Sequence, residues 1–358
     1  MRLAVDAANL VRDRRGMGRL ARTVLAAAAR EPDVTLTLLA CDRDARILHD
    51  EFGGPVAHPR SAARPGTYDV VWYPFNGMRF PARAPAVVLM HDAFAFTEPA
   101  RDAVARRRER APMRRAARDA AIVTTSRWAA GEIARELAIP RARITLVRPQ
   151  ADAYFSPGAR VLPPTLGCER FVLLVGVGER RKNARTALAA CAQALRAPAE
   201  LLVIAGALSD DDRRYALRCA TPAVQVSPGD ALLRELYRSA AAVLVPSFAE
   251  GFGLVAIEAL ACGAPVIASS ASALPEAVAG AALLVEPGDV ASWARALRRT
   301  FDDAVLEGAL RRDACDFAAR DRGGFAAGML AVLRAAAAGM CADDVVDGGG
   351  EAALEGGR

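Results

Sequence analysis

Hydrophobic positions along the chain occur in short runs that alternate with longer segments of mixed polarity. The runs that predict buried strands are residues 3–5, 34–40, 68–72, 87–90, 121–125 and 144–147, then 171–175, 201–205, 224–226, 243–246, 265–268 and 283–285. Helices are expected between them, including 19–30, 101–118 with an interruption at Pro112, and 127–137 after an N-terminal cap at Ser126. Short apolar strands that alternate with helices predict an α/β protein with parallel, doubly wound sheets.

The alternation stops once and then starts again, which predicts two domains. Residues 153–170 are rich in proline and glycine and indicate a linker. We expect two Rossmann-like domains that face each other across a cleft, with ligands beyond the carboxyl ends of the strands. The expected divisions are 1–155, 165–325, a helix at 326–340, and a disordered, acidic, glycine-rich tail at 341–358.

Composition narrows the class of protein. The chain has 358 residues, of which 53% are hydrophobic and 25% charged, and this balance excludes global disorder. No apolar run reaches the roughly 20 residues that a membrane span needs. Asp6 interrupts any export signal at the N-terminus, so a cytoplasmic protein is expected. With three histidines and no Cys-x-x-Cys pair, we expect no metal site.

The positive charge of the chain is almost entirely arginine. The formal net charge is +6, and 46 of the 47 basic residues are arginine, which leaves Lys182 as the single lysine. A basic chain suits an anionic ligand or surface. A single lysine indicates a position where a compact ammonium group is needed, or it reflects chance, and composition leaves both open.

The segment 176–183 follows a predicted strand and suits a phosphate. Small residues such as Gly178 let a ligand approach the backbone, and Arg181 and Lys182 add positive charge beside the start of a helix. The alternative is an ordinary glycine-flanked turn with solvated arginines.

The segment 246–267 carries two carboxylates, Glu250 in a glycine-rich turn and Glu258 within an otherwise apolar helix. A carboxylate in such a helix is costly unless it is hydrogen-bonded, and the hydroxyls of a sugar or ribose are suitable partners. The free amides of residues 251–254, at the start of the same helix, suit a pyrophosphate.

This segment resembles the donor-binding signature of the retaining glycosyltransferases of family 4, which have the GT-B fold. The Glu-x7-Glu spacing is present, followed by Gly-Phe-Gly-Leu at 251–254 and Ala-Leu-Pro-Glu at 273–276. The resemblance extends toward the N-terminus through Gly-Met-Gly-Arg at 16–19 and the strand that ends in His-Asp at 91–92. The Arg-Lys-Asn sequence at 181–183 is similar to that of bacterial mannosyltransferase-like and polysaccharide enzymes.

The resemblance implies a role for each matching residue. Arg181 and Lys182 would bind the donor diphosphate, Glu250 would hold the hydroxyls of the donor sugar, and Glu258 would hold the ribose. His91 would orient the donor sugar. Arg181 stands in for an arginine that many members carry at the position of Val177 here. The other positions implied in donor binding are Gly16, Gly18, Gly178, Val226, Leu232, Gly251, Phe252, Gly253 and Leu254.

The resemblance thus predicts a retaining, metal-independent glycosyltransferase. Its donor would be GDP-mannose or a UDP-sugar, and its acceptor a hydroxyl of a glycan, a lipid-linked glycan or a small molecule. The resemblance assigns charge compensation to cationic side chains and helix amides rather than to a metal ion. Two alternatives stay open: a nucleotide-sugar epimerase of the same fold and an inactive sugar-nucleotide-binding regulator. A NAD-dependent enzyme is disfavoured, because no Gly-x-Gly-x-x-Gly follows a strand.

The stretch from Arg101 to Arg118 is strongly basic. One interpretation is a peripheral contact with the inner face of an anionic membrane, or with a lipid-phosphate acceptor. The other is a solvated helix face in an arginine-rich chain. Nucleic-acid binding is not expected, because no aromatic platform accompanies the charge.

Overall fold

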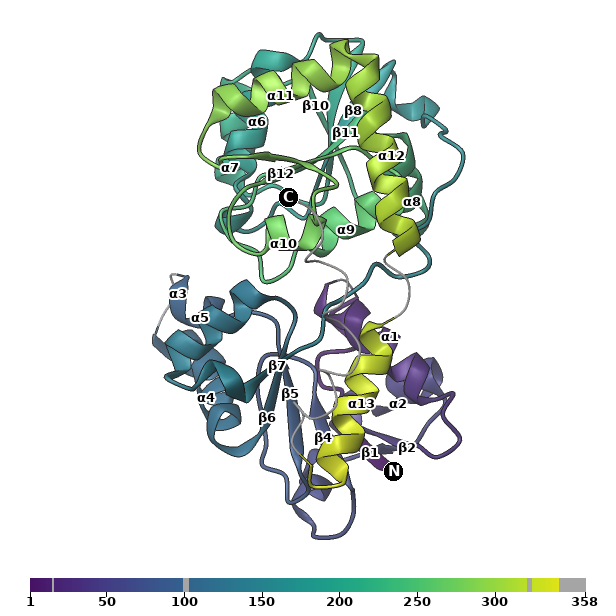
Figure 1. The fold of residues 1–358 in the computed structure, drawn as a ribbon, viewed down its shortest axis with the longest axis vertical. Helices are drawn as coiled ribbons and strands as arrows, with labels where there is room; N and C mark the ends of the chain where they lie inside the picture. Colours follow the sequence, from purple (N-terminus) through teal and green to yellow (C-terminus); the bar gives the residue numbers. More distant parts are fainter. Residues whose placement is uncertain (15, 99–102, 321–323, 341–358) are drawn as a thin grey trace, which may run out of the picture. The chain divides into compact units, whose positions relative to one another are not determined.

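The computed structural model describes residues 1–14, 16–98, 103–320 and 324–340, and within them the chain forms two compact units. The first unit runs from Met1 to Pro149 and also contains the C-terminal helix α13 (Phe325–Ala337), which packs against helix α1 and strands β4 and β5. The second unit runs from Gln150 to Arg322 (Figure 1). The predicted tail at 341–358 lies outside the described residues.

The first unit is built on a parallel sheet with the strand order β3-β2-β1-β4-β5-β6-β7 in the described part of the chain. Its strands are β1 (Arg2–Asp6), β2 (Thr35–Leu39), β3 (Val56–Ala57), β4 (Val70–Tyr73), β5 (Ala86–Met90), β6 (Ala121–Thr124) and β7 (Ile144–Leu146). Its helices besides α13 are α1 (Met17–Ala28), α2 (Asp42–Phe52), α3 (Phe94–Thr97), α4 (Ala103–Asp119) and α5 (Arg127–Leu137).

The second unit repeats this plan with the strand order β10-β9-β8-β11-β12-β13, again parallel throughout its described strands. Its strands are β8 (Arg170–Val175), β9 (Glu200–Ala205), β10 (Ala223–Val226), β11 (Ala242–Val245), β12 (Val266–Ser269) and β13 (Leu283–Val285). Its helices are α6 (Ala184–Ala194), α7 (Asp210–Arg218), α8 (Asp230–Ser239), α9 (Leu254–Ala261), α10 (Leu274–Val278), α11 (Val290–Asp302) and α12 (Ala304–Arg320).

The predicted architecture of two doubly wound parallel sheets is confirmed. The continuous apolar runs arise because each central strand is buried on both faces. In β8, Phe171 and Leu173 join the core on one face of the sheet, whereas Val172 and Leu174 join the core on the other. Alternate residues point to opposite faces of a strand, so a strand between two helix layers needs apolar residues at every position.

Of two local predictions for the helices of the first unit, the cap at Ser126 is confirmed and the break at Pro112 is not. Ser126 caps α5 as predicted, and its side chain accepts a hydrogen bond from the amide of Ala129. The predicted interruption at Pro112 is wrong, because α4 runs through it from Ala103 to Asp119. Proline removes one helical hydrogen bond, but Met113 and Ala116 are buried just after it, and Arg110 just before it bonds the carbonyl oxygens of Ala95 and Phe96.

Helix α2 and strand β3 were not predicted from the sequence. Helix α2 has apolar residues at helical spacing, Ala45, Leu48 and Phe52, but they stand among six charged side chains and only Leu48 is buried. Strand β3 has two residues, Val56 and Ala57, and pairs with β2 at the edge of the sheet.

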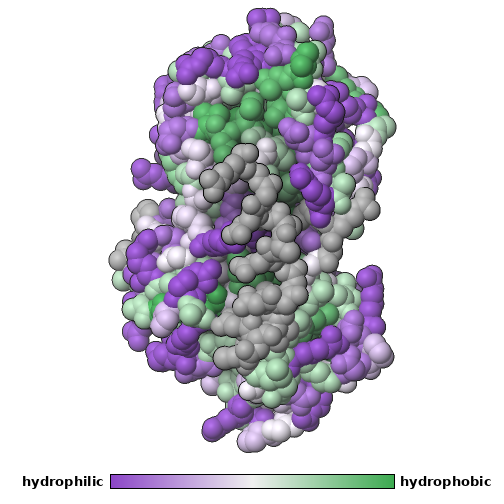
Figure 2. All heavy atoms as spheres, in the orientation of Figure 1, coloured by the Kyte–Doolittle hydropathy of each residue, from purple (hydrophilic) through white to green (hydrophobic). Residues whose placement is uncertain are grey.

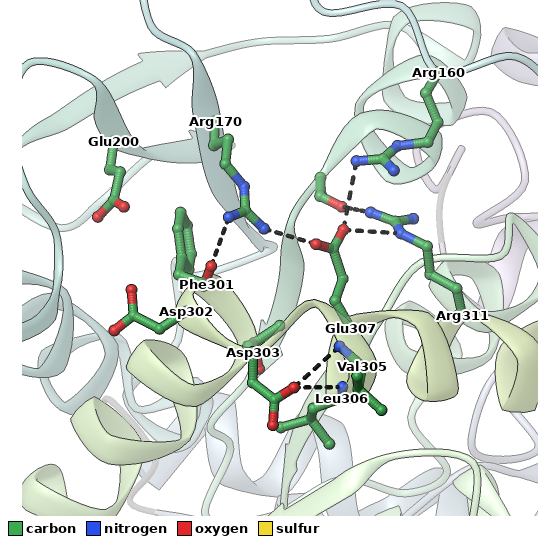
Figure 3. A network of polar contacts seen from close by, with 12 residues as sticks. Arg160, Arg170, Glu200, Phe301, Asp302, Asp303, Val305, Leu306, Glu307 and Arg311 are labelled. Atoms are coloured by element: carbon green, nitrogen blue, oxygen red, sulfur yellow. Dashed lines mark hydrogen bonds and ion pairs between the residues drawn. The ribbon is translucent and has the colours of Figure 1, made fainter.

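An arginine–carboxylate cluster joins helix α12 to the sheet of the second unit (Figure 3). Glu307 accepts hydrogen bonds from Arg170 of β8 at 2.8 Å and from Arg311 at 3.1 Å. Arg311 also donates to the carbonyl oxygens of Gly263 and Ala240. These contacts anchor the last helix of the unit to the strands that carry the candidate site.

The surface of the second unit mixes hydrophilic patches with a gathering of hydrophobic residues (Figure 2). Single exposed apolar residues such as Val305 and Leu217 are usual at protein surfaces. Within the described ranges, no helix combines the length and the apolar character that a membrane crossing requires.

Candidate active site

In the second unit, two loops leave the sheet where the strand order reverses. Strand β8 has β9 on one side and β11 on the other, so the helices after β8 and β11 lie on opposite faces of the sheet. The loop 176–183 follows β8, and the loop 246–253 follows β11. In open α/β sheets, this is the place where ligands bind.

Three charged side chains from these loops meet at this point. The Nζ atom of Lys182 lies 2.7 Å from Oε1 of Glu250, and Nη1 of Arg181 lies 3.2 Å from Oε2 of the same carboxylate. The hydroxyl of Ser247 donates to Oε1 at 2.7 Å. The Nε atom of Arg181 donates to Oε2 of Glu179 at 2.8 Å, which further fixes the position of the guanidinium group.

The carboxylate of Glu250 is buried but ionised. Its side chain is 8% exposed, against 17% for Lys182 and 13% for Arg181. Burial alone would raise the pKa of Glu250, but the charges of Lys182 and Arg181, with the hydrogen bonds from Lys182 and Ser247, outweigh it and hold that pKa below its usual value. The second carboxylate partner of Arg181, Glu179, is 64% exposed and therefore screened by solvent. The buried part of the cluster holds two cations and one carboxylate, which suits an anionic ligand.

Asn183 fixes the relative position of the loops that bring these charges together. Its backbone adopts the left-handed conformation, with φ of 54°. Its Nδ2 atom donates to the carbonyl oxygens of Pro246 at 2.9 Å and Pro287 at 2.7 Å, and its Oδ1 atom accepts from Thr186. One buried amide therefore ties together the loops that follow β8, β11 and β13.

The predicted amide-rich turn forms the start of helix α9. Gly253 has φ of 113°, a conformation that favours glycine, and a Cβ atom there would lie 2.7 Å from Cδ2 of Leu274, whose side chain would have to move. Gly251 and Phe252 are buried in this turn, and α9 begins at Leu254. The amide of Glu250 donates to the hydroxyl of Ser272, which closes the turn from the side of β12.

Glu258 lies in α9 and is 7% exposed, as expected for a carboxylate that needs a partner. The hydroxyl of Tyr237, in helix α8, donates to its Oε2 atom at 3.2 Å. Helix α9 thus places Glu250 before its first turn and Glu258 within its second turn.

The remaining predicted positions of the second unit lie around the same edge of the sheet. Gly178 is exposed in the loop after β8. Val226 ends β10 and packs partly against the core, whereas Leu232 in α8 is 42% exposed. No contact connects Val226 or Leu232 directly with the charged cluster in the described structure.

In the first unit, His91 stands at the carboxyl end of β5 and is 7% exposed. Its Nε2 atom lies 2.9 Å from the carbonyl oxygen of Pro74, which can only accept, so Nε2 carries the hydrogen. Burial lowers the pKa of His91 to about 4. The Oδ1 atom of Asn76 accepts a hydrogen bond of 2.6 Å from the backbone amide of His91, which holds the backbone at this position, while the bond to Pro74 orients the ring.

Gly16 and Gly18 occupy positions that favour glycine for different structural reasons. Gly16 is exposed, has φ of 55° and precedes helix α1. Gly18 is buried, and a Cβ atom there would lie only 1.9 Å from the carbonyl oxygen of Asp13. Contact within the chain is therefore sufficient to require glycine at position 18, and the predicted role in ligand approach stays a prediction.

Sequence reasoning missed several residues that shape the site. Ser247 and Ser272 bond the side chain and amide of Glu250, Asn183 ties the loops, and Tyr237 bonds Glu258. Ser247 carries a local signal, since it stands three residues before Glu250 in the same loop. The other contacts span between 21 and 104 residues of sequence, so pattern alone gives no sign of them.

Comparison with known proteins was made on sequence and on structure. Residues 169–303 match the protein family described as Glycosyl transferases group 1. The O-antigen chain mannosyltransferase B of Escherichia coli is 32% identical over 278 residues, which cover 71% of this chain and 72% of that protein. The D-inositol 3-phosphate glycosyltransferase 1 of Catenulispora acidiphila is 38% identical, over 57% of this chain and 54% of its own length. Against the enzymes of that name from two Salinispora species, the chain spans only 20% and 24% of the relative.

Solved structures share the fold across nearly the whole chain. The sucrose-phosphate synthase of Thermosynechococcus elongatus superposes with a TM-score of 0.72 at 20% identity, covering 95% of this chain and 100% of that one. The Anabaena protein HepE, solved in complex with UDP-glucose, superposes with a TM-score of 0.67 at 17% identity, covering 89% and 94%.

Proposed function

The chain belongs to the group 1 glycosyl transferases and has a GT-B-type fold, and from this premise we propose that it transfers a sugar from a nucleoside diphosphate to an acceptor hydroxyl. The observation that carries the proposal is the cluster of Lys182, Arg181 and Glu250 at the point where strand order reverses in the second unit. In this proposal the donor diphosphate lies beside Lys182 and Arg181, and the amides of residues 251–254 add donors.

The charge of the cluster fits the chemistry of the transfer. When the bond between the anomeric carbon and the phosphate oxygen breaks, negative charge grows on the leaving diphosphate. Cations held in place beforehand stabilise that charge without having to reorganise during the reaction. Lys182 and Arg181 are held in this way by Glu250. A bound diphosphate would compete for both cations and leave the oxygens of Glu250 available to the sugar hydroxyls.

We carry over the remaining roles from the family resemblance. Glu258, beside Tyr237, would bind the ribose. Val226 and Leu232 would lie near the base. His91, neutral and fixed by Pro74, would orient the donor sugar by hydrogen bonding, and its low pKa makes it unsuited to serve as a cation at neutral pH.

The finer chemistry of the proposal is a retaining transfer without a metal ion. The acceptor oxygen forms its bond to the anomeric carbon on the face that the diphosphate leaves, and the acceptor proton passes to the departing phosphate oxygen. Charge compensation is assigned to Lys182, Arg181 and backbone amides. The donor is GDP-mannose or a UDP-sugar: the Escherichia coli relative is named a mannosyltransferase, and HepE was solved with UDP-glucose.

The test measures release of nucleoside diphosphate from GDP-mannose and UDP-glucose, first with water and then with added glycan acceptors, in the presence and absence of EDTA. We expect one donor to be turned over, with EDTA having no effect, and a product whose anomeric configuration, read by NMR, matches the donor. Inversion would refute retention, and loss of activity with EDTA would refute metal independence. Tight nucleotide binding with no turnover of any donor would favour the inactive regulator, and an epimerised nucleotide sugar would favour the epimerase.

A further inference from the structure

Helix α4 of the first unit (Figure 1) carries arginines along one face. Successive members stand one, three or four positions apart, which keeps them on the same side of a helix with 3.6 residues per turn. The two alanines among them leave room between the long side chains. The resulting hollow has a volume of about 410 Å³ and is lined by Ala103, Arg107, Arg110, Ala111, Arg114, Arg115 and Arg118.

Carboxylates do not balance these charges. In the part of the chain that the structure describes, none of the five arginines that line the hollow forms an ion pair. Glu109 lies more than a quarter turn around the helix from each of them, because residues advance by about 100° along an α-helix. Asp119 stands one turn beyond Arg115 but forms no ion pair in the described structure. On helix α7, by contrast, Arg213 pairs with Asp210 at 3.0 Å and Arg214 pairs with Asp211 at 2.5 Å.

The walls of the hollow are partly fixed by the rest of the unit. Arg110 donates from Nε to the carbonyl oxygen of Ala95 at 2.6 Å and from Nη2 to that of Phe96 at 3.2 Å. Arg115 donates to the carbonyl oxygen of Met78 at 3.3 Å. The guanidinium groups of Arg110 and Arg114 lie 5.1 Å and 5.6 Å from the ring centre of Phe96. Side chains ordered in advance lower the entropic cost of binding a ligand.

We propose that this hollow binds a compact polyanion that carries at least two phosphate groups. The guanidinium group presents a planar fork of donors that matches phosphate oxygens two at a time. Five guanidinium groups line the hollow, so a single monovalent anion would neutralise only one of five positive charges. A free polyphosphate and the headgroup of an anionic lipid share this chemistry. The site shares no residue with the donor site and does not depend on the proposed transfer reaction.

Isothermal titration of the full chain with inorganic tripolyphosphate tests the site. The variant replaces the three most exposed arginines, as Arg107→Gln, Arg114→Gln and Arg118→Gln, and keeps Arg110 and Arg115, which bond the backbone. We expect the parent to show two classes of site. The triple variant should lose one of them, with affinity at least about tenfold weaker because several charge-assisted contacts are removed.

The control variants separate this site from the donor site and from bulk charge. Lys182→Ala should lose the other class of site and keep the one on α4. The double variant Arg213→Gln/Arg214→Gln removes exposed helical arginines from α7 and should titrate like the parent. If the triple variant binds like the parent, or if the α7 control weakens binding equally, the proposed site does not exist.

Vesicles distinguish the two sources of the anion. Sedimentation with phosphatidylcholine vesicles, with and without cardiolipin, whose headgroup carries two phosphate groups, is compared for the parent and the triple variant. Binding that requires cardiolipin and all three arginines assigns the site to a lipid headgroup. Tripolyphosphate binding without vesicle binding assigns it to a free polyphosphate. Failure of the parent to bind either probe at α4 overturns the proposal.

Discussion

Both sheets reverse their strand order beside a central strand, β1 in the first unit and β8 in the second. The chemistry at the two places differs. The second unit carries an ionised cluster of Lys182, Arg181 and Glu250. In the first unit, burial raises the pKa of Asp6, at the end of β1, and lowers that of His91, which follows β5 two strands away, to about 4. The carboxyl edge of the second sheet thus holds an ion-paired cluster, whereas burial at the same edge of the first sheet disfavours charge on Asp6 and His91.

The difference shows what the fold supplies and what individual side chains supply. Each edge uses an asparagine in the left-handed conformation, Asn76 with φ of 50° and Asn183 with φ of 54°. Asn76 accepts from the amide of His91, and Asn183 donates to Pro246 and Pro287. The shared topology provides a place where loops meet. In the second unit, Lys182 and Arg181 make this edge of the sheet suitable for an anion. In the first unit, the neutral, hydrogen-bonded His91 lies at the corresponding edge of the sheet.

The largest expected effect comes from removing the lysine of the charged edge. Lys182→Ala should lower turnover of the nucleotide sugar by roughly 10²–10³, as for loss of one preorganised electrostatic group. Steady-state rates and a circular dichroism melt of the same sample give the measurement. His91→Gln, on the neutral edge, should reduce turnover less than Lys182→Ala. A larger loss of turnover in His91→Gln than in Lys182→Ala would contradict the contrast between the two sheet edges.

Because His91 is buried in its neutral form, the folded chain should lose stability as pH falls. The pKa of His91 is about 4 in the folded chain, against about 6.5 for an unfolded histidine. The unfolded state therefore binds the proton first as pH falls, and about 2–3 kcal/mol of stability should disappear between pH 7 and pH 4.5. Glu250 does not contribute in this window, because its pKa is held below its usual value and its share is lost only at lower pH.

Urea unfolding of the parent and of His91→Gln at both pH values measures this effect. The parent should lose more stability than the variant, and His49→Gln, at an exposed position, should behave like the parent. Equal losses in the parent and in His91→Gln would show that the imidazole is not buried in its neutral form.

The two asparagines test how firmly the loops are tied. Asn183→Gly keeps the left-handed conformation accessible but removes the donor to two buried carbonyl oxygens. We expect a loss of about 2 kcal/mol, the cost of leaving buried acceptors without a partner. Asn76→Gly removes the acceptor of the His91 amide and a donor to Asp92 at 3.3 Å, fewer bonds than Asn183 makes, and should cost less. Thermal melting of both variants compares the two, and a larger loss for Asn76→Gly would contradict the assigned contacts.

The smallest effect is expected for Tyr237→Phe. The change removes the hydroxyl that donates to Glu258 at 3.2 Å and should cost about 1 kcal/mol of stability. Nucleotide affinity, measured by titration, should change less than in Glu258→Gln, because the carboxylate that we assign to the ribose remains. A greater loss of affinity in Tyr237→Phe would place the nucleotide contact on the tyrosine instead.

Much of the fold could be predicted from the sequence because buried parallel strands must be apolar at every position, as Phe171 to Val175 are. Helix α2 escaped prediction because its few apolar residues stand among six charged side chains and only Leu48 is buried. Pro112 misled because its effect depends on packing around Met113 and Ala116, which local propensity does not contain.

Some residues of the candidate site could be identified from the sequence and others could not. The charged residues Arg181, Lys182 and Glu250 were identified from loop composition and family resemblance, and the structure brings them together. Ser272 and Asn183 were not identified, because their roles depend on loops that become neighbours only when the sheet assembles.

The central claim is that the charged edge of the second unit binds a nucleoside diphosphate. Thermal melting with GDP, UDP, ADP and dTDP tests it most directly, since a ligand at about 100 times its dissociation constant adds roughly 2.7 kcal/mol of stability. The account predicts that one of the four raises the melting temperature by several degrees, that Lys182→Ala abolishes the shift, and that the triple arginine variant of α4 keeps it. No shift with any nucleotide, or a shift that survives unchanged in Lys182→Ala, would contradict the account.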